Sequence, residues 1–516
     1  MRIRAYIITC NHRNAVCART LCNFARTDWG SPPEVTFSLR DSPNAHERWQ
    51  GATATILQSV RADDSDYFLF LEDDLDFNRH LRHNLINWEP LRQRKAIVAS
   101  LDHPKVAVDS TNEADHYSIS ERRAFLTGDA LLFKRDAALR ILEDASTNSE
   151  TGVCTISELA QRWMSGKPLY YHRPSLVQRK PENRGLCDDR TAVDFDPDFK
   201  AQVHQKKTIL INYDCMWDWW RHDHLLRFFP YLEAYYEFVV SDDPTFVIYS
   251  VYGNAKQFNE RAVRVVIAGE PGDYLYWARR SEHHIDHHFF HFGLTNCWEN
   301  RSATHVYMPT FYLHMMYQHG GLECLIRSRT DRLPRKDFFC DFIYANGRCM
   351  PRIEFYDRLA RYKRIECPGP VRHNFEGVGN GDPHTRYRIK QQFQSRCRFS
   401  IAYENTFPPA KRFEDRLHTS PQAVGYITEK LVDPLIARSV PIYRGTEVVD
   451  EVFNPNAFIH IDKHRTTAEA IERVKMVDQD DDLYEAYLHE PALRNNELPG
   501  IMSDERYLQF FRSIFG

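Results

Sequence analysis

Paired cysteines, long apolar runs and a one-sided charge are all missing from this chain. Its twelve cysteines are spread singly between Cys10 and Cys397 with no Cys-x-x-Cys pair, which argues against a disulfide scaffold and favours a reducing compartment. No segment approaches about eighteen consecutive apolar residues, and the strand-like start at residues 1–9 lacks the apolar run and cleavage site of a signal peptide. We therefore expect a soluble, cytoplasmic protein without a membrane span.

Charge and glycine content exclude further classes of protein. The formal net charge of −4 gives no sign of a nucleic-acid-binding or polybasic membrane surface. Glycine is scarce, at 21 residues, and the sequence contains no low-complexity tract or short-period repeat. What remains is ordinary globular composition, 42% apolar and 27% charged, in a chain of 516 residues that is too long for one core. Two or more domains are expected.

The chain divides into two halves that each alternate short apolar runs with helical patterns. Helical patterns around 49–60 and 79–91 lie between apolar runs, which is typical of an α/β domain with a mostly parallel sheet. Residues 186–206 are acidic, then basic, and poor in aliphatic side chains, so we interpret them as a linker between domains at 1–185 and 207–516. The runs of the first half that we expect to be strands are 5–9, 35–39, 67–71, 96–100 and 130–133.

The second half contains a strand–helix–strand unit equipped to bind a diphosphate. Apolar runs at 399–405 and 440–445 flank a helix that opens on Thr428, Glu429 and Lys430. The helix start brings together a hydroxyl, a carboxylate, a fixed cation and the free N–H groups of the first turn. This equipment suits a diphosphate-bearing ligand.

Several segments of the second half resemble the α-1,3-fucosyltransferase family, glycosyltransferase family ten, in the family's order. The resemblance covers nearly all of residues 207–516 and implies two Rossmann-like lobes in the GT-B arrangement, an acceptor lobe at 207–330 and a GDP-fucose lobe at 331–516. It also implies transfer of L-fucose from GDP-fucose with inversion and without a catalytic metal. The matching segments are 264–271, 346–352 with 355–356, 426–430 and 453–459.

The resemblance assigns roles to individual residues. Arg352 and Lys430 match the pair that contacts phosphate, and the planar fork of arginine suits two phosphate oxygens. Glu270 follows the run 265–269 in the position of the catalytic base, which takes the proton of the acceptor hydroxyl. The alternative is that 269–272 is only an exposed turn. Residues that match the sugar and ribose end of the donor site are Asn405, Tyr426 and Glu429.

Three departures from the family pattern leave the acceptor open. Arg444 stands where the family usually has tryptophan, Pro434 interrupts the helix after Lys430, and the stretch 406–424 is longer than the usual loop. The histidine-rich segment 282–291 offers metal-like i, i+4 pairs, but the resemblance makes 287–292 a strand, so we expect a mixed strand face. We expect the acidic run 478–482 to be a helix-capping turn.

In the first half an apolar strand runs into the acidic segment Glu72–Asp76. Hard divalent cations take carboxylate oxygens as ligands, and α/β folds bind ligands where their strands end. The segment resembles the DxD motif of GT-A glycosyltransferases, which implies a single Rossmann-like nucleotide-sugar domain that uses Mn²⁺ or Mg²⁺. We expect Asp74 to be the metal ligand, Asp76 a reserve ligand, and Asp73 a contact to ribose or to the metal's surroundings. The alternative is an acidic helix cap.

Other features of the first half support a nucleotide site more weakly. Thr9 ends the first strand and, with Arg13 just beyond, is placed to touch a nucleotide base. Glu158 is the candidate catalytic base of this half, and Asp129 competes for that role. His172 is either a further metal ligand or a plain surface histidine.

These features together predict a bifunctional glycosyltransferase in glycan biosynthesis, including protein glycosylation. The C-terminal domain would use GDP-fucose and the N-terminal domain a UDP-sugar, UDP-xylose or UDP-galactose, with a glycan or glycoprotein as acceptor. The pairing resembles multidomain enzymes of chloroviruses. One alternative is a fucosyltransferase whose first domain only positions the acceptor, and another is a non-catalytic glycan-binding protein that keeps degenerate sites.

Overall fold

The structure is a computed structural model, and its chain divides into two compact units. The first unit comprises Met1–Lys206 with Tyr231–Tyr235, and the second comprises Lys207–Pro230 with Tyr236–Gly516. The described residues are 1–38, 41, 45–102, 112–114, 117–120, 129–147, 169–179, 192, 194–203, 205–217, 220–221, 223–250, 261–269, 290–296, 298, 304–327, 333–377, 383–406, 408 and 423–516. Within these residues every helix is too short or too polar to traverse a bilayer.

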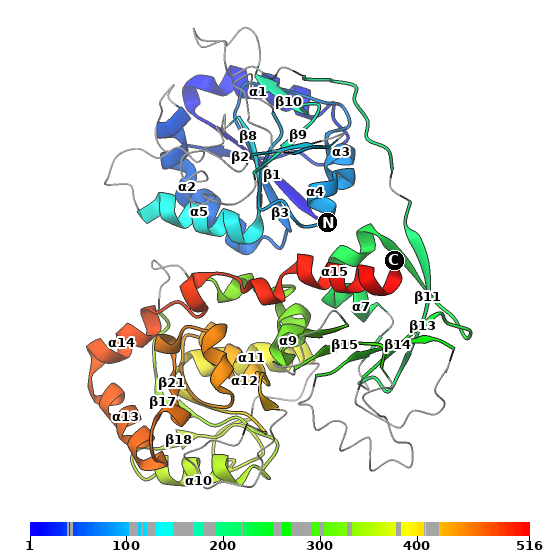
Figure 1. The fold of residues 1–516 in the computed structure, drawn as a ribbon. Coiled ribbons are helices and arrows are strands. Elements are labelled where there is room, and N and C mark those ends of the chain that lie inside the picture. Colours follow the sequence, from blue (N-terminus) through cyan, green and yellow to red (C-terminus); the bar gives the residue numbers. More distant parts are fainter. Residues whose placement is uncertain are drawn as a thin grey trace. The chain divides into compact units, whose positions relative to one another are not determined.

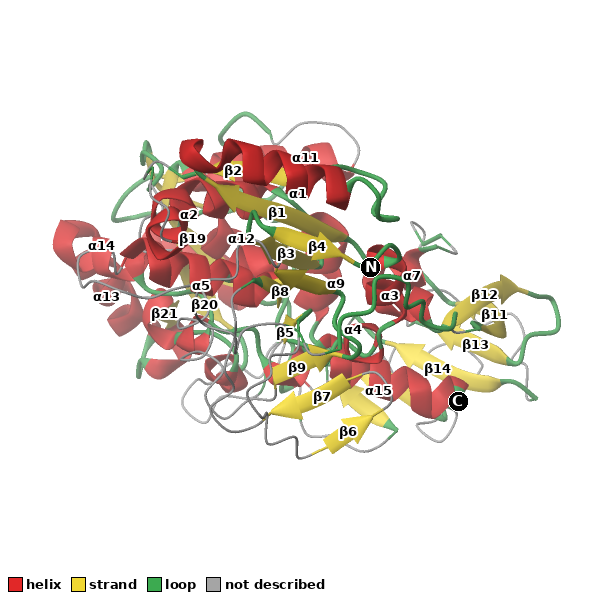
Figure 2. Cartoon of the chain, turned by 90° about the horizontal axis from the view of Figure 1, so that it is seen from above, coloured by secondary structure: helices red, strands yellow, loops and turns green. Residues whose placement is uncertain are grey.

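The first unit is built on an eight-stranded sheet in the order β2-β1-β3-β8-β5-β9-β7-β6 (Figure 2). Strands β1, β2 and β3 are parallel, but β8 runs antiparallel to both β3 and β5. The prediction of a mostly parallel sheet is therefore wrong, because the sheet contains both parallel and antiparallel strand pairs. A buried strand reads as the same apolar run in either direction, so the sequence pattern does not reveal this reversal. The strands are β1 (Ile3–Thr9), β2 (Glu34–Phe37), β3 (Tyr67–Leu71), β5 (Val98–Ser100), β6 (Asn112–Ala114), β7 (Tyr117–Ser120), β8 (Ala130–Lys134) and β9 (Leu169–His172).

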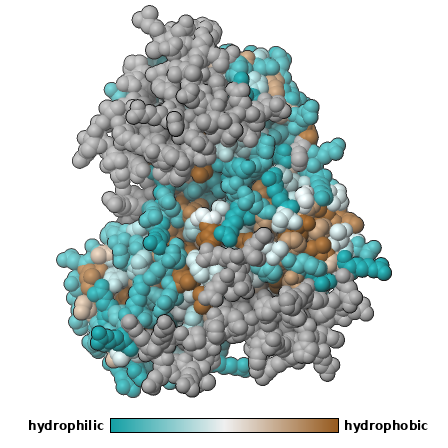
Figure 3. Space-filling view, in the orientation of Figure 1, coloured by the Kyte–Doolittle hydropathy of each residue, from teal (hydrophilic) through white to brown (hydrophobic). Residues whose placement is uncertain are grey.

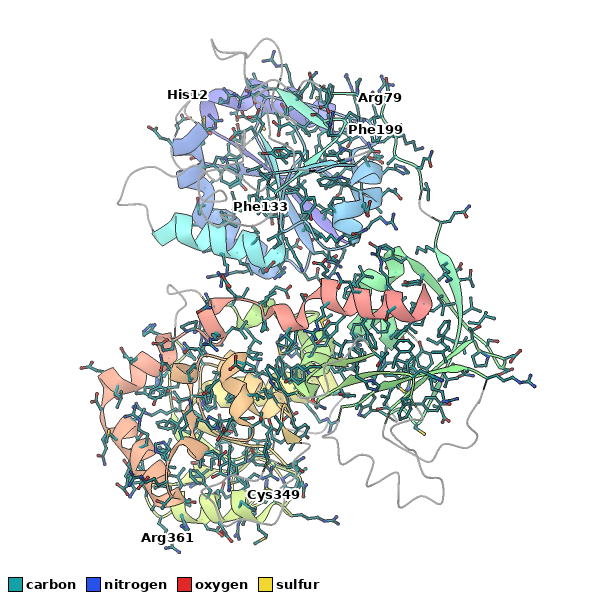
Figure 4. The ribbon with its side chains drawn as sticks, viewed as in Figure 1. His12, Arg79, Phe133, Phe199, Cys349 and Arg361 are labelled. Carbon is teal, nitrogen blue, oxygen red and sulfur yellow. The ribbon has the colours of Figure 1, made fainter. Side chains whose placement is uncertain are left out.

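Helices cover both faces of this sheet and bury two apolar clusters. One cluster joins α2 and α5 to the sheet and includes Phe133, which is labelled in Figure 4. The other joins the opposite face to α1, α3 and α4. The helical pattern predicted at 79–91 is confirmed but divided at Trp88, next to Pro90 in the first turn of α4. The helices are α1 (Asn14–Phe24), α2 (Ala45–Ala62), α3 (Leu81–Asn87), α4 (Glu89–Arg92) and α5 (Arg135–Thr147), and a separate antiparallel pair joins β4 (Leu75–Phe77) to β10 (Val177–Arg179).

The described part of the expected linker is bonded to the first unit. The Asn78 side-chain amide donates hydrogen bonds to the carbonyl oxygens of Asp196 (2.7 Å) and Phe199 (3.0 Å). Asp194 accepts a hydrogen bond from the backbone N–H of Ser175 at 3.0 Å. This segment therefore extends the first unit rather than forming a free connector.

The second unit begins with a six-stranded sheet in the order β12-β11-β13-β14-β15-β16, in which every strand pair is parallel. The C-terminal helix α15 (Asp504–Phe515) returns to this first lobe, where Phe515 packs against Tyr236 and Phe246. The other elements are β11 (Lys207–Asp214), β12 (Tyr236–Val240), β13 (Phe246–Tyr249), β14 (Val263–Ile267), β15 (Phe292–Thr295), β16 (His305–Tyr307), α7 (His224–Phe228) and α9 (Thr310–His319).

The second lobe of this unit holds a five-stranded parallel sheet in the order β18-β17-β19-β20-β21. Helices α13 and α14 lie on one side of the sheet and α11 and α12 on the other (Figure 1), and the outer surface over α13 and α14 is mainly hydrophilic (Figure 3). Asp480 caps α14 by accepting a hydrogen bond from Leu483 N–H, which confirms the capping role expected for this acidic run. The elements are β17 (Phe338–Asp341), β18 (Ile365–Glu366), β19 (Cys397–Tyr403), β20 (Val440–Arg444), β21 (Ile459–His460), α10 (Met350–Leu359), α11 (Pro383–Ser395), α12 (Glu429–Ile436), α13 (Thr467–Gln479) and α14 (Asp481–His489).

Candidate active site

A pocket of about 210 Å³ opens in the second lobe, beside the ends of β17 and β19 and the N-terminus of α12. The carboxyl ends of parallel strands and the free N–H groups of a helix start are where open α/β sheets bind phosphate-bearing ligands. The predicted strand–helix–strand unit is confirmed as β19, α12 and β20. Polar side chains that line the pocket are Asp341, Tyr344, Asn346, Lys390, Gln394, Asn405, Glu429 and Lys430.

Thr428 and Glu404 fix the start of α12 against the end of β19. Thr428 is the N-cap residue and accepts a hydrogen bond from Lys430 N–H at 3.3 Å. Its own hydroxyl and N–H donate to the two carboxylate oxygens of Glu404, at 2.6 and 2.8 Å. Burial raises the pKa of Glu404 to about 7. Cys349, labelled in Figure 4, packs from the start of α10 with its thiol 3.8 Å from the Glu404 carbonyl oxygen.

Lys430 and Glu429 form an ion pair at the pocket wall. Lys430 Nζ lies 3.1 Å from Glu429 Oε1 and 3.9 Å from Glu404 Oε2. Desolvation raises the pKa of Glu429, but Lys430 and Lys390 outweigh it and bring that pKa to about 2. Burial opposes the charge of Lys430, yet Glu429 and Glu404 raise its pKa above the ordinary value. The wall therefore presents a permanent cation beside a permanent carboxylate.

Arg352 is fully buried behind the wall of the pocket. Its guanidinium donates hydrogen bonds to the carbonyl oxygens of Tyr403 (3.3 Å) and Asn346 (2.5 Å) and to Asn405 Oδ1 (3.1 Å). Its Cζ atom lies 3.7 Å from the ring centre of Tyr344. Over the described residues no carboxylate forms an ion pair with it, so its charge is buried without a partner of opposite sign. Arg352 holds Asn346 and Asn405, which line the pocket themselves.

Gly425 and Tyr426 bring the motif against the first lobe of the same unit. Gly425 has φ = +99°, and a Cβ atom there would lie 2.4 Å from the carbonyl oxygen of Asn296. The Tyr307 hydroxyl donates a hydrogen bond to the Gly425 carbonyl oxygen at 2.9 Å. Tyr426 itself is buried. Only glycine fits this left-handed, closely packed position.

Replacing Gly425 by alanine is expected to lower the free energy of unfolding by about 2 kcal/mol or more. The left-handed backbone and the contact with Asn296 both oppose a side chain here. Gly500→Ala is the matched control, since a Cβ atom at Gly500 meets nothing within 4 Å. Urea unfolding curves of the two variants measure the difference. Equal free energies of unfolding for the two variants would contradict the conclusion that only glycine fits at position 425.

Hydrogen bonds connect the end of β14 to the start of α12. Glu270 itself lies outside the described residues, but the carbonyl oxygen of Gly269, which precedes it, accepts a hydrogen bond from Thr310 Oγ1 at 2.5 Å. The next residue, Phe311, donates its N–H to the Ile427 carbonyl oxygen at 3.0 Å. Through the first turn of α9, hydrogen bonds therefore link Gly269, the residue before the candidate base, to Ile427, the residue before the N-cap Thr428.

The remaining expectations for the second half have mixed outcomes. Arg444 is buried, with Nε 3.1 Å from Asp462 Oδ1, and takes a structural role at the end of β20. Pro434 is accommodated inside α12, which ends two residues later. Most of 406–424 and the histidines of 282–289 lie outside the described residues. The strand expected to begin at position 287 is described only from Phe292.

In the first unit, Asp73 is fully engaged by neighbouring side chains. The Thr9 hydroxyl donates to Asp73 Oδ2 at 2.6 Å, and Arg13 Nε donates to Asp73 Oδ1 at 2.8 Å. Arg13 Nη2 also lies 3.3 Å from Asp74 Oδ2. Thr9 and Arg13 thus lie where the sequence places them, beside the acidic segment, but their polar atoms bind Asp73 in this structure.

Asp74 keeps one buried carboxylate oxygen without a hydrogen bond among the described residues, Oδ1, which lies 3.7 Å from Arg179 Nε. Asp76 Oδ1 accepts a hydrogen bond from the Asn23 amide at 2.6 Å. Within the described ranges no group of three or more histidine, cysteine or acidic side chains is arranged to hold a metal. Asp74 and Asp76 therefore fit a divalent cation only if water and the diphosphate of a bound nucleotide sugar supply most of the oxygen atoms that coordinate the metal.

Three further residues of the first unit were candidates for a catalytic or metal-binding role: Asp129, His172 and Glu158. Asp129 Oδ1 accepts a hydrogen bond from Arg179 at 2.8 Å, and burial raises its pKa. His172 is a buried residue rather than a surface one, with Nδ1 2.7 Å from the Pro174 carbonyl oxygen. Glu158 lies outside the described residues.

Two residues at this site were not predicted from the sequence. Glu404 follows an apolar strand run, and its place just before Asn405 is the signal that could have identified it. Lys390 lies on α11, nearly forty residues from the motif, and only the tertiary fold brings it to the pocket.

Comparisons with known proteins agree with this geometry. Residues 334–490 match the family model "Glycosyltransferase family 10 (fucosyltransferase) C-term". A provisionally named fucosyltransferase of Acanthamoeba polyphaga mimivirus is 24% identical over 347 residues, 65% of this chain and 51% of that protein. The alpha-(1,3)-fucosyltransferase FucT of Helicobacter pylori is 27% identical over 203 residues, 38% of this chain and 37% of that protein. The chain thus spans about half or less of the length of these relatives.

A crystal structure of an α1,3-fucosyltransferase with GDP-fucose is similar over 61% of this chain and 93% of that chain. It is 19% identical, with a TM-score of 0.45. The residues matched by the family model include the whole pocket wall, from Asp341 to Lys430. Residues 334–490 form a C-terminal domain of glycosyltransferase family 10, the fucosyltransferases.

Proposed function

We propose that residues 207–516 transfer L-fucose from GDP-fucose, with inversion, to a glycan or glycoprotein acceptor. The observation that supports this most is the position of Lys430 and the α12 N-terminus at the wall of a pocket within a fucosyltransferase-family domain. A fixed cation and free N–H groups favour the charge that develops on a leaving diphosphate. Because Lys430 supplies that charge, this half of the protein is proposed to need no metal.

In the proposed reaction the acceptor hydroxyl oxygen attacks the anomeric carbon of fucose. The bond from that carbon to the β-phosphate oxygen breaks, and GDP leaves with the electron pair. Glu270 takes the proton of the acceptor hydroxyl. The hydrogen bonds from Thr310 to Gly269 and from Phe311 to Ile427 join the residue before Glu270 to the residue before the Thr428 cap, which supports this assignment.

The remaining residues of the pocket would orient the donor. Asn405 lines the pocket and is held by Arg352, so its amide is fixed for a contact to ribose or sugar. The carboxylate of Glu429 is ionised and therefore suits sugar hydroxyl donors. Tyr426 is buried and would shape the wall. Arg352 would act through Asn346 and Asn405 and through its uncompensated positive charge.

A second activity is favoured by one observation in the first unit: Asp74 Oδ1 is buried just beyond β3 and accepts no hydrogen bond from the described residues, with Arg179 Nε 3.7 Å away. We propose that this unit transfers a second sugar from a UDP-sugar, UDP-xylose or UDP-galactose, with Asp74 binding Mn²⁺ or Mg²⁺ and Asp76 in reserve. When bound, the metal would neutralise the leaving diphosphate. Thr9 and Asp73 would contact the nucleotide, and Glu158 would serve as base. The alternative remains a unit that only positions the acceptor.

A panel of nucleotide sugars, offered with Mn²⁺ or with a chelator, tests both proposals by release of nucleotide. GDP-fucose turnover is expected to be unchanged by chelation and by Asp74→Asn. Turnover of the second donor is expected to fall at least about tenfold under either treatment. Loss of GDP-fucose turnover on chelation would contradict the two-site assignment. Absence of any second donor would favour the acceptor-positioning alternative.

A further inference from the structure

Lys390 lines the same pocket as Lys430 but approaches it from a different helix. It lies in α11 and donates a hydrogen bond from Nζ to Asp433 Oδ2 at 2.7 Å. Its side chain is 21% exposed, and the pocket is the cavity that it borders. An ammonium group at a pocket wall remains available to a ligand while it keeps one carboxylate partner, because it carries three donor hydrogens.

Asp433 holds Lys390 in place from a fixed position on α12. Asp433 is one turn beyond Glu429 on the same helix face, and its other oxygen, Oδ1, lies 2.9 Å from His314 Nε2. Burial opposes the charge of Lys390, but Asp433 and Glu429 raise its pKa above the ordinary value, so it stays protonated. The ammonium group is therefore anchored and charged before any ligand arrives.

The contrast with Arg352 indicates what Lys390 does. The guanidinium of Arg352 is fully buried, and it donates to protein oxygens behind the wall. Among the described residues, the cationic side chains that line the pocket are Lys390 and Lys430. A diphosphate has two negatively charged groups, and two lysines on different helices can approach it from two sides.

We propose that Lys390 is a donor-binding residue that contacts the diphosphate together with Lys430. This inference rests on the proposed use of GDP-fucose, and it assigns to Lys390 the direct cationic contact that the sequence resemblance assigns to Arg352. Lys390 neutralises phosphate charge, and Asp433 and His314 position it.

Titration calorimetry with GDP and with guanosine tests the contact. Lys390→Met is expected to weaken GDP binding by about tenfold and to leave guanosine binding unchanged, because only GDP carries phosphate. Lys363→Met is the matched control, since Lys363 also pairs with an aspartate of this lobe, Asp478, but does not line the pocket. It is expected to bind both ligands as the wild type does.

Unchanged GDP affinity in Lys390→Met, or an equal loss for guanosine, would overturn the assignment of Lys390 alone. Wild-type protein that binds no GDP would overturn the proposed function and this inference with it. If the Lys390→Met variant does not fold, acetylation of Lys390 in the wild-type protein tests the same contact. Excess GDP, but not guanosine, is expected to protect Lys390 from acetylation, as read by peptide mass, and absence of protection would count against the contact.

Discussion

Replacing Glu270 by glutamine is expected to lower kcat for fucose transfer by about 1,000-fold and to leave GDP affinity unchanged. Glutamine keeps the size and polarity of the side chain but cannot take the proton of the acceptor hydroxyl. The residue before Glu270 is fixed to α9, and α9 is fixed to the residue before the Thr428 cap. The described residue before Glu270 is thus connected by hydrogen bonds to the start of α12.

Initial rates at saturating GDP-fucose and acceptor, together with GDP titration, measure the effect of Glu270→Gln. Glu237→Gln is a matched control, because Glu237 is an exposed carboxylate on β12 of the same lobe. The control is expected to retain wild-type kcat. A Glu270→Gln variant with more than a tenth of wild-type kcat would show that another group takes the proton.

Replacing Lys430 by methionine is expected to lower kcat by about 100-fold and to weaken GDP binding by about tenfold. The larger effect on kcat follows because negative charge grows on the diphosphate as the glycosidic bond breaks, so the cation stabilises the transition state more than the bound donor. The substitution also removes the ion-pair partner of Glu429 and the positive charge that lies 3.9 Å from Glu404 Oε2. Thermal unfolding must therefore accompany the kinetics.

Lys475→Met provides the control for Lys430→Met, because Lys475 lies on α13 and pairs with Glu472 by the ordinary i, i+3 contact. Wild-type kcat and GDP affinity are expected for it. If Lys430→Met raises KM and leaves kcat intact, the lysine binds donor and transition state equally well, and the proposed role in leaving-group stabilisation fails.

The α12 motif could be predicted from sequence because its information is local. Thr428, Glu429 and Lys430 are consecutive, and a capping hydroxyl with a first-turn carboxylate marks a helix start in any context. Arg352 was predicted from the family resemblance of segment 346–352, which does not give the direction of its side chain. Whether a guanidinium faces a pocket or the core depends on Tyr344 and Tyr403, which the tertiary fold brings beside it.

Lys390 and the mixed sheet of the first unit could not be predicted, for two physical reasons. Lys390 reaches the pocket through the packing of α11 on α12, which leaves no trace in any short window of sequence. Strand β8 runs antiparallel to both of its neighbours, β3 and β5, and an apolar run in the sequence carries no sign of strand direction.

For the acidic segment of the first unit, the sequence predicts the position in the fold but not the side chains that pair with it. Its position at the end of β3 was predictable, since an apolar run ends at Glu72. Its partners are Arg13, Arg48 and Arg179, which come from three separate elements and pair with Asp73, Glu72 and Asp74 respectively. The metal site stays a prediction, and Asp74 Oδ1, 3.7 Å from Arg179 Nε, is the oxygen of this segment that accepts no hydrogen bond from the described residues.

The central claim, that the pocket beside α12 binds the diphosphate of GDP-fucose without a metal, is tested most directly by titration of GDP into the wild-type protein in chelator-containing buffer. The account predicts saturable binding with one site, weakened about tenfold by Lys430→Met and unaffected by Asp74→Asn. GDP binding that requires Mn²⁺, or that is lost in Asp74→Asn and retained in Lys430→Met, would contradict it.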